Sequence, residues 1–193
     1  MKALTEVLNP DVRQAALVTL DIGGWRPMEV RDCHRPLESI LVMDAVPEAV
    51  RKQFDIARDL MLYGWFVYEF YTVAVQQAYA CLEFGLREAC KKVNNGENPC
   101  EKKKGLACYI TWAEKNGLIP AGKYHEELRL FVPALRNSIG HGSSTLFNYA
   151  LAMPTLEIVA DLLNVVFGSE EVKSKRQQNM VSDDNGKGGA SSC

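Results

Sequence analysis

The spacing of apolar residues changes at Pro47 and divides the chain into two parts. Before Pro47 the pattern is mixed: residues 17–20 suit a short strand and residues 23–27 a turn. After it, apolar residues recur every three or four positions, as on the buried stripe of an amphipathic helix. The first such stripe consists of Val50, Phe54, Ala57 and Met61. Pro47 suits the first position of a helix and Glu48 its positive end, so we expect an N-terminal arm of residues 1–46 and then helices.

Residues 60–75 form the most apolar segment of the chain. A membrane span is one interpretation of it, but the run has about 16 residues, contains Glu69 and is rich in tyrosine, whereas a span needs about 20 apolar residues. We therefore expect a helix that is buried on most sides, with Gly64 at a break or a close helix crossing, and no membrane partner.

Helical spacing continues after this segment. A stripe rich in small residues would let a second helix approach closely; it consists of Ala74, Ala78, Cys81, Leu82, Gly85, Leu86 and Ala89. Residues 94–99 suit a loop and residues 105–116 a further helix. Another helix begins near Lys123 and is kinked or restarted at Pro133.

The last helical stretch is interrupted or restarted at Pro154 and ends at Gly168. Its predicted buried stripe consists of Leu156, Val159, Leu163 and Val166. Residues 169–193 are polar and predicted to be a disordered tail. The prediction is an all-α fold: a compact bundle of about five helices over residues 47–168, with an N-terminal arm and a disordered C-terminal tail.

The charge balance narrows the functions that the chain could have. Its 193 residues include 22 Lys and Arg against 24 Asp and Glu, a formal net charge of −2. A protein that holds nucleic acid by bulk electrostatics usually carries a strong basic excess, which this chain lacks. Residues 87–104 differ, with six basic and three acidic side chains, and are either a solvated surface or part of a nucleic-acid site.

The cysteines indicate thiols rather than disulfides. The first residues lack the apolar run of a signal peptide, so we expect reduced cysteines and a cytoplasmic protein. A zinc site of Cys90, Cys100, Cys108 and His125 is an alternative, but spacings of 10, 8 and 17 match no standard zinc motif. We therefore expect no metal and no cofactor.

Residues 135–143, Leu-Arg-Asn-Ser-Ile-Gly-His-Gly-Ser, are the strongest candidate for chemistry. Arg136 offers a permanent planar fork for phosphate oxygens, and His141 can exchange a proton near neutral pH. Asn137 lies four residues before His141, on the same helical face, and the glycines beside His141 leave room for a substrate. A histidine that caps a helix beside a surface arginine is the alternative that these residue types allow.

The run from Arg136 to His141 resembles the signature of HEPN domains, an arginine and a polar residue followed by a histidine after four to six intervening residues. Residues 82–87, Leu-Glu-Phe-Gly-Leu-Arg, resemble a pattern on the second helix of many members. The resemblance covers about residues 50–168. It implies a bundle of four to five helices and a metal-independent endoribonuclease, often in a toxin–antitoxin or antiviral defence system. In such members two subunits place both motifs in one cleft, so the implied partners are RNA, a second copy, and an antitoxin or other protein.

The resemblance also implies a role for each site residue. His141 would act as general acid or base on the ribose 2′-hydroxyl or the leaving oxygen, and Arg136 would hold the scissile phosphate. Asn137 would orient His141 or the phosphate. Glu83 would fix Arg136, although an ion pair with Arg87, four residues on, is the alternative use of Glu83. The product would be a 2′,3′-cyclic phosphate.

The chain departs from the family pattern at one position. Toxin members paired with a nucleotidyltransferase antitoxin often have tyrosine two residues after the histidine, where this chain has Ser143, so control by tyrosine modification is not expected. Many members are inactive. The second hypothesis is therefore a non-catalytic HEPN-like module that dimerises or binds a nucleotide or a partner protein, and the third is a helical protein of another role.

Overall fold

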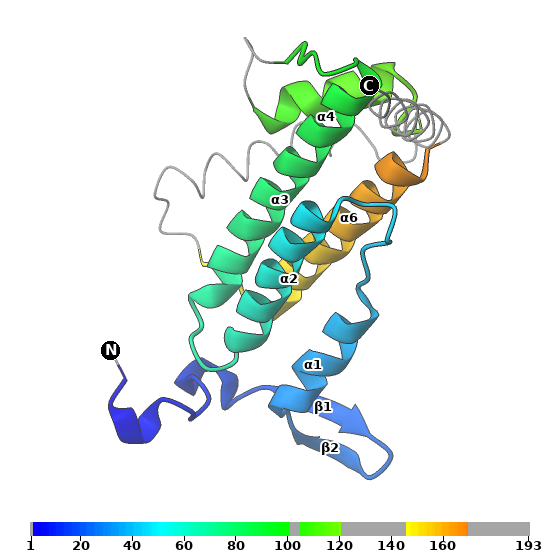
Figure 1. Ribbon diagram of the computed structural model, residues 1–193. Coiled ribbons are helices and arrows are strands. Elements are labelled where there is room, and N and C mark those ends of the chain that lie inside the picture. Colours follow the sequence, from blue (N-terminus) through cyan, green and yellow to red (C-terminus); the bar gives the residue numbers. More distant parts are fainter. Residues whose placement is uncertain (1, 101–104, 121–145, 170–193) are drawn as a thin grey trace, which may run out of the picture.

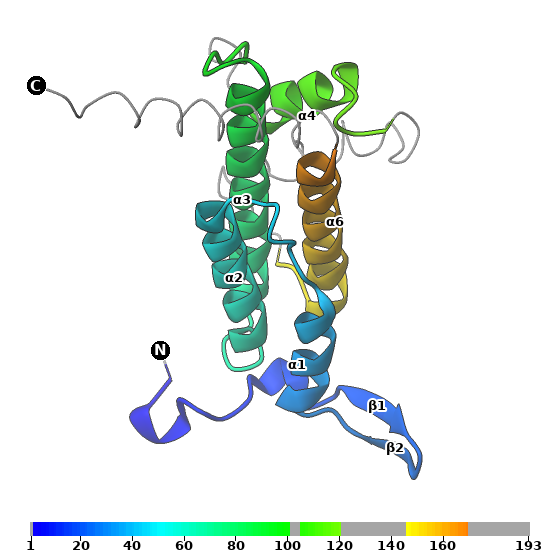
Figure 2. The ribbon, with the colours of Figure 1, turned by 45° about the vertical axis from the view of Figure 1, so that its right-hand side comes forward.

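Three long helices lie side by side and carry the core of the protein (Figure 1). The computed structural model describes residues 2–100, 105–120 and 146–169. Within them, the long helices are α2 (Glu48–Tyr63), α3 (Phe70–Val93) and α6 (Tyr149–Gly168). The shorter α4 (Leu106–Lys115) packs against one end of α3, and α1 (Val30–Ser39) packs against α2 near the opposite end of the bundle (Figure 2). The predicted all-α bundle with an N-terminal arm is confirmed.

The buried stripes of α2, α3 and α6 are the ones that the sequence predicts. Every residue of the three predicted stripes is at most 1% exposed, apart from Gly85, which is also buried. Close packing of the helices depends on the small residues: a Cβ atom added to Gly85 would lie 2.4 Å from Cδ2 of Leu163 on α6 and 3.3 Å from Cγ1 of Val50 on α2. Gly85 therefore lies where α3 packs closely against both α2 and α6.

Gly64 ends α2 and starts the turn into α3. It is the C-cap of α2: its amide donates to the carbonyl of Leu60 at 2.9 Å, and the next amide, that of Trp65, donates to the carbonyl of Leu62 at 3.1 Å. A Cβ atom at Gly64 would lie 2.4 Å from both Cδ1 and Cε1 of the Tyr71 ring, which is fully buried on the first turn of α3. Gly64 is thus the predicted break, and its close contact is with a tyrosine ring rather than at a crossing of two helices.

The arm contains more regular structure than the sequence pattern predicts. It has two 3-10 turns (Leu4–Glu6 and Val12–Gln14) and an antiparallel hairpin of β1 (Val18–Asp21) and β2 (Gly24–Pro27). The predicted strand is confirmed with a shift of one residue, whereas most of the predicted turn forms β2. Helix α1, which includes Pro36, was not predicted.

The later helices show one correction. Helix α4 ends as predicted, at Asn116 and at Gly117 with its φ of 71°. The predicted interruption of α6 is wrong, because α6 is continuous through Pro154 from its N-cap Asn148 to Gly168. Proline removes one backbone hydrogen bond and its ring crowds the carbonyl four residues earlier, and the burial of the helix on both sides of it compensates for these costs. The predicted helix from Lys123 and the tail beyond Ser169 lie outside the described residues.

Helix α6 is the one described helix that is long and apolar enough to cross a membrane by length and composition, with a mean hydropathy of 1.6. Slightly more than half of that window, 56%, is buried inside the protein. A core helix of a bundle has the same composition, and α6 packs against both α2 and α3.

Candidate functional site

The predicted catalytic residues Arg136, Asn137 and His141 lie outside the described residues, and so does His125. Glu83, the predicted supporting residue, lies on α3. Among the described residues no cluster of three or more His, Cys, Asp or Glu side chains could bind a metal ion. Of the predicted site residues, the structure therefore describes only Glu83 and the helix α3 that carries it.

Glu83 lies on a partly exposed face of α3. The residues at spacings of four, three and four that share this face are Gln76, Ala80, Glu83 and Arg87. Gly85, where α2 and α6 approach α3, lies on the opposite side of the helix by the same spacing. Glu83 and Arg87 are both half-buried, so this face offers a carboxylate and a guanidinium that are only partly solvated.

Arg87 is held by its neighbours on α3. Its guanidinium carbon lies 5.2 Å from the centroid of the Phe84 ring, a cation–π geometry, and its Nε lies 3.9 Å from Oε1 of Glu88. Lys91 Nζ contacts the same Glu88 oxygen at 3.2 Å. Two of the basic residues of the 87–104 segment therefore share one carboxylate, which lowers the positive potential that they could offer to a nucleic acid.

Beyond Lys91, a shallow depression of about 420 Å³ lies at the end of α3. It is lined by Lys91, Gly96, Glu97, Asn98 and Pro99. One cation and one anion face it, so it has no charge excess that would select a phosphate.

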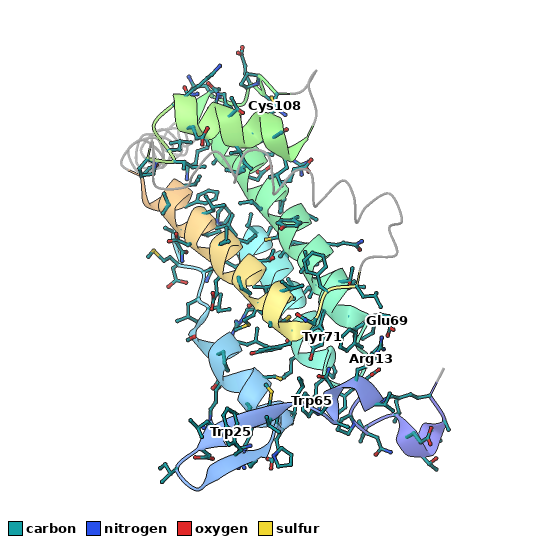
Figure 3. The ribbon with its side chains drawn as sticks, turned by 180° about the vertical axis from the view of Figure 1, so that it is seen from behind. Arg13, Trp25, Trp65, Glu69, Tyr71 and Cys108 are labelled. Atoms are coloured by element: carbon teal, nitrogen blue, oxygen red, sulfur yellow. The ribbon has the colours of Figure 1, made fainter. Side chains whose placement is uncertain are left out.

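A second polar centre lies where the arm meets the turn between α2 and α3 (Figure 3). Arg13 binds Asp11 through Nε at 2.8 Å and through Nη2 at 2.9 Å, and the same Nη2 lies 2.8 Å from Oε1 of Glu69. The guanidinium carbon is 4.1 Å from the centroid of the Tyr68 ring. The hydrogen bonds from Arg13 hold the pKa of Asp11 well below its usual range, and the pKa of Glu69 is lowered for the same reason.

Next to Arg13, a buried layer fastens the arm to the core. Gln14 is 3% exposed and donates from Nε2 to the hydroxyl of Tyr71 at 3.1 Å and to the carbonyl of Gly64 at 3.3 Å. The Tyr71 ring meets the rings of Tyr68 and Tyr149 edge to face. Burial raises the pKa of Tyr71 above its usual value, so its hydroxyl is a neutral hydrogen-bonding group here.

This centre was not found from the sequence. Arg13 and Glu69 are 56 residues apart, and Gln14 and Tyr71 are 57 apart. Neither pair falls on a helical period or in a local motif, so no pattern in the chain connects them. The contacts are those of a structural anchor, because each charged group is satisfied by another protein group.

The arm also forms a groove with the turn between α2 and α3. The groove has a volume of about 600 Å³ and a mostly apolar lining of Leu4, Val7, Phe66 and Val67, with Lys2, Asp11 and Glu69 at its polar edge. A smaller cavity of about 290 Å³ lies between α1 and α2, beside His34, Glu38, Asp55, Arg58 and Asp59. Arg58 there donates to the carbonyl of Leu37 and binds Asp55 at 3.2 Å, so its guanidinium is used within the protein.

No protein-family model, no curated protein and no solved structure matches this chain.

Proposed function

We propose that the protein is a metal-independent endoribonuclease of HEPN type that acts as a homodimer. The Arg-Asn-Ser-Ile-Gly-His run from Arg136 to His141 carries this proposal. Two features of the described residues support it. The chain is a helical bundle, as the resemblance implies, and the segment that resembles the second HEPN helix lies on the central helix α3, with Glu83 half-buried on its partly exposed face.

The proposed reaction is a transesterification within RNA. His141 takes the proton of a ribose 2′-hydroxyl, and the 2′-oxygen attacks the neighbouring phosphorus. The bond from phosphorus to the 5′-oxygen of the next nucleotide breaks, and that oxygen takes up a proton from the acid form of a histidine. The products are a 2′,3′-cyclic phosphate and a 5′-hydroxyl. No metal is consumed or required, because Arg136 would balance the charge that develops on the phosphate oxygens.

A homodimer would compensate for the weak attraction of a single chain for RNA. A chain with a net charge of −2 attracts RNA only weakly over its whole surface. Two copies that share a cleft would bring two arginines and two histidines to one phosphate, so that binding is local. Glu83 would act on this site indirectly, by holding Arg136 in the orientation that the phosphate needs.

The test is a cleavage assay with purified protein and mixed RNA in EDTA. We expect the parent to cut RNA and to leave 2′,3′-cyclic phosphate ends, and His141→Ala and Arg136→Ala each to lower the rate at least about 100-fold, the usual range for a general acid or base. His34→Ala and Arg31→Ala are matched controls, since both side chains are at least half exposed on α1, and both variants should cut like the parent.

The Glu83 role has its own readout. Glu83→Gln keeps the size of the side chain and removes its charge, so we expect a lower kcat at an unchanged melting temperature.

Failure of the parent to cut any RNA would refute the enzymatic function and favour the second hypothesis, a non-catalytic HEPN-like module. Equal activity of the parent and the His141→Ala variant would exclude the assigned chemistry.

A further inference from the structure

The hairpin of the arm has its apolar face turned away from the protein. Leu20 pairs with Trp25 across the two strands, and Val18 with Pro27, so these four side chains share one face. The exposed fractions of Val18, Leu20 and Trp25 are 56%, 66% and 72%, and Ile22 at the tip is fully exposed. A hairpin that serves only its own chain would bury this face.

The opposite face of the hairpin is polar, and it is the one fastened to the protein. Arg26 lies on that face and binds Asp21 through Nε at 3.0 Å. Its two terminal nitrogens each lie 2.8 Å from an oxygen of Asp32, on the first turn of α1. Asp32 also accepts the amide of Glu29 at 2.8 Å. This bidentate contact fixes the orientation of the hairpin relative to α1.

The apolar face projects away from the helices. Figure 2 shows β1 and β2 extending beyond the base of the bundle, beside α1. The strands pair only with each other among the described residues. A two-stranded hairpin alone is marginally stable in water, so the exposed apolar face is a cost to the isolated chain.

We propose that this apolar face, with Val18, Leu20 and Trp25 as its exposed strand residues and Ile22 at its tip, is covered by the same face of a second copy of the chain. At roughly 100 Å² for an exposed aliphatic side chain and 200 Å² for tryptophan, the four residues expose on the order of 400 Å². One side of a standard interface buries about 800 Å², of which about 450 Å² is apolar. The face therefore supplies nearly all of the apolar area that one subunit of a stable dimer needs.

A two-fold axis suits this surface. An isologous interface brings the same patch of both subunits together, and an apolar face is complementary to itself. The charges near it are already balanced within each chain, with Arg26 on Asp21 and Arg31 on Glu29 at 2.9 Å. Two copies can therefore meet without bringing unpaired like charges together.

This face would be the surface that forms the proposed homodimer, so the inference rests in part on the proposed function. Its test measures association alone: a parent that dimerises through the hairpin but cuts no RNA keeps the interface and refutes the activity. The full chain and a Leu20→Asp/Trp25→Asp variant are compared by sedimentation equilibrium between 1 and 100 µM. We expect a dimer for the parent and a dissociation constant at least about 30-fold higher for the variant, the loss that central interface residues usually cause. Leu41→Asp is the matched control, because Leu41 is 65% exposed on a loop outside the hairpin, and this variant should stay dimeric.

A second measurement leaves the hairpin itself unchanged. Trp65 is 4% exposed, so in a Trp112→Phe chain most acrylamide quenching reports on Trp25. The proposal predicts that quenching falls as the protein concentration rises through the dissociation constant. A parent that is monomeric at 100 µM, a hairpin variant that dimerises like the parent, or quenching that does not change with concentration would each overturn the second copy as the occupant of this face.

Discussion

The close contact between Gly64 and the Tyr71 ring predicts that even a small side chain at position 64 will lower the stability of the fold. A methyl group at Gly64 would lie 2.4 Å from two ring carbons of Tyr71, more than an ångström inside normal contact. The ring cannot move away without a cost, because it is fully buried, packs edge to face on Tyr68 and Tyr149, and accepts the Gln14 hydrogen bond at 3.1 Å. Gly64→Ala should therefore destabilise the protein.

The magnitude follows from two costs. Overpacking by one methyl group costs about 1–3 kcal/mol, and displacing the ring leaves the buried Gln14 amide short of one partner, which costs about 1 kcal/mol more. Gly64 has a φ of −55°, which alanine adopts without strain, so backbone conformation adds nothing to the loss. The expected loss is about 2–4 kcal/mol in the free energy of unfolding, or a drop in Tm of roughly 5–15 °C for a chain of this length.

Urea denaturation followed by circular dichroism measures this loss. Gly168→Ala is the matched control, because Gly168 also ends a helix and a Cβ atom there would meet nothing within 4 Å; it should change stability by less than about 0.5 kcal/mol. In a Tyr71→Leu background the clash is removed, and Gly64→Ala should then cost much less. Equal stability of Gly64→Ala and Gly168→Ala would refute the argument that Tyr71 is locked in place.

Three further outcomes are expected. Ionised Asp11, whose pKa Arg13 depresses, stabilises the folded state above about pH 4 and loses that effect as the pH falls; Arg13→Met should therefore show a smaller drop in urea midpoint from pH 7 to pH 3 than the parent. Pro154→Ala restores a backbone hydrogen bond inside α6, but it also gives the unfolded chain more conformational entropy, which offsets part of the gain. The net increase in the free energy of unfolding should be about 1–2 kcal/mol. Burial raises the pKa of Cys81 to about 12, so at pH 8 iodoacetamide should label the half-buried Cys108 before Cys81, and Cys81 only on unfolding, as mass spectrometry would show.

The helices that the sequence predicts are those whose stability comes from a continuous buried stripe. In α2, Val50, Phe54, Ala57 and Met61 repeat at helical spacing and are all buried. Helix α1 also has an apolar stripe, Val30, Cys33 and Leu37, but it is only 10 residues long and contains Pro36, which disfavours a helix in the sequence pattern. Its ends are held from elsewhere: Arg26 binds Asp32 at its start, and Arg58 of α2 donates to the carbonyl of Leu37 at 2.9 Å near its end.

The residues of the two polar centres likewise differ in whether a local sequence pattern could reveal them. Arg136 and His141 stand five residues apart, so a local pattern is enough to propose them. Arg13 and Gln14 act on Glu69 and Tyr71 across more than 50 residues, and only the folded chain brings them together. Local spacing reveals residues that share a loop or a helix turn, whereas contacts between the arm and the bundle depend on where α2 turns into α3.

The anchoring of the arm bears on how the hairpin could associate. Binding costs free energy when a surface must be ordered first, and an element that is already held in place avoids much of this cost. The arm is held at two points, by Gln14 against Tyr71 just before the hairpin and by Arg26 of β2 against Asp32 on α1. Weakening the second point with Arg26→Met should therefore weaken self-association even though Arg26 lies on the opposite face from Trp25. A dissociation constant equal to that of the parent would show instead that the apolar face associates without a fixed hairpin.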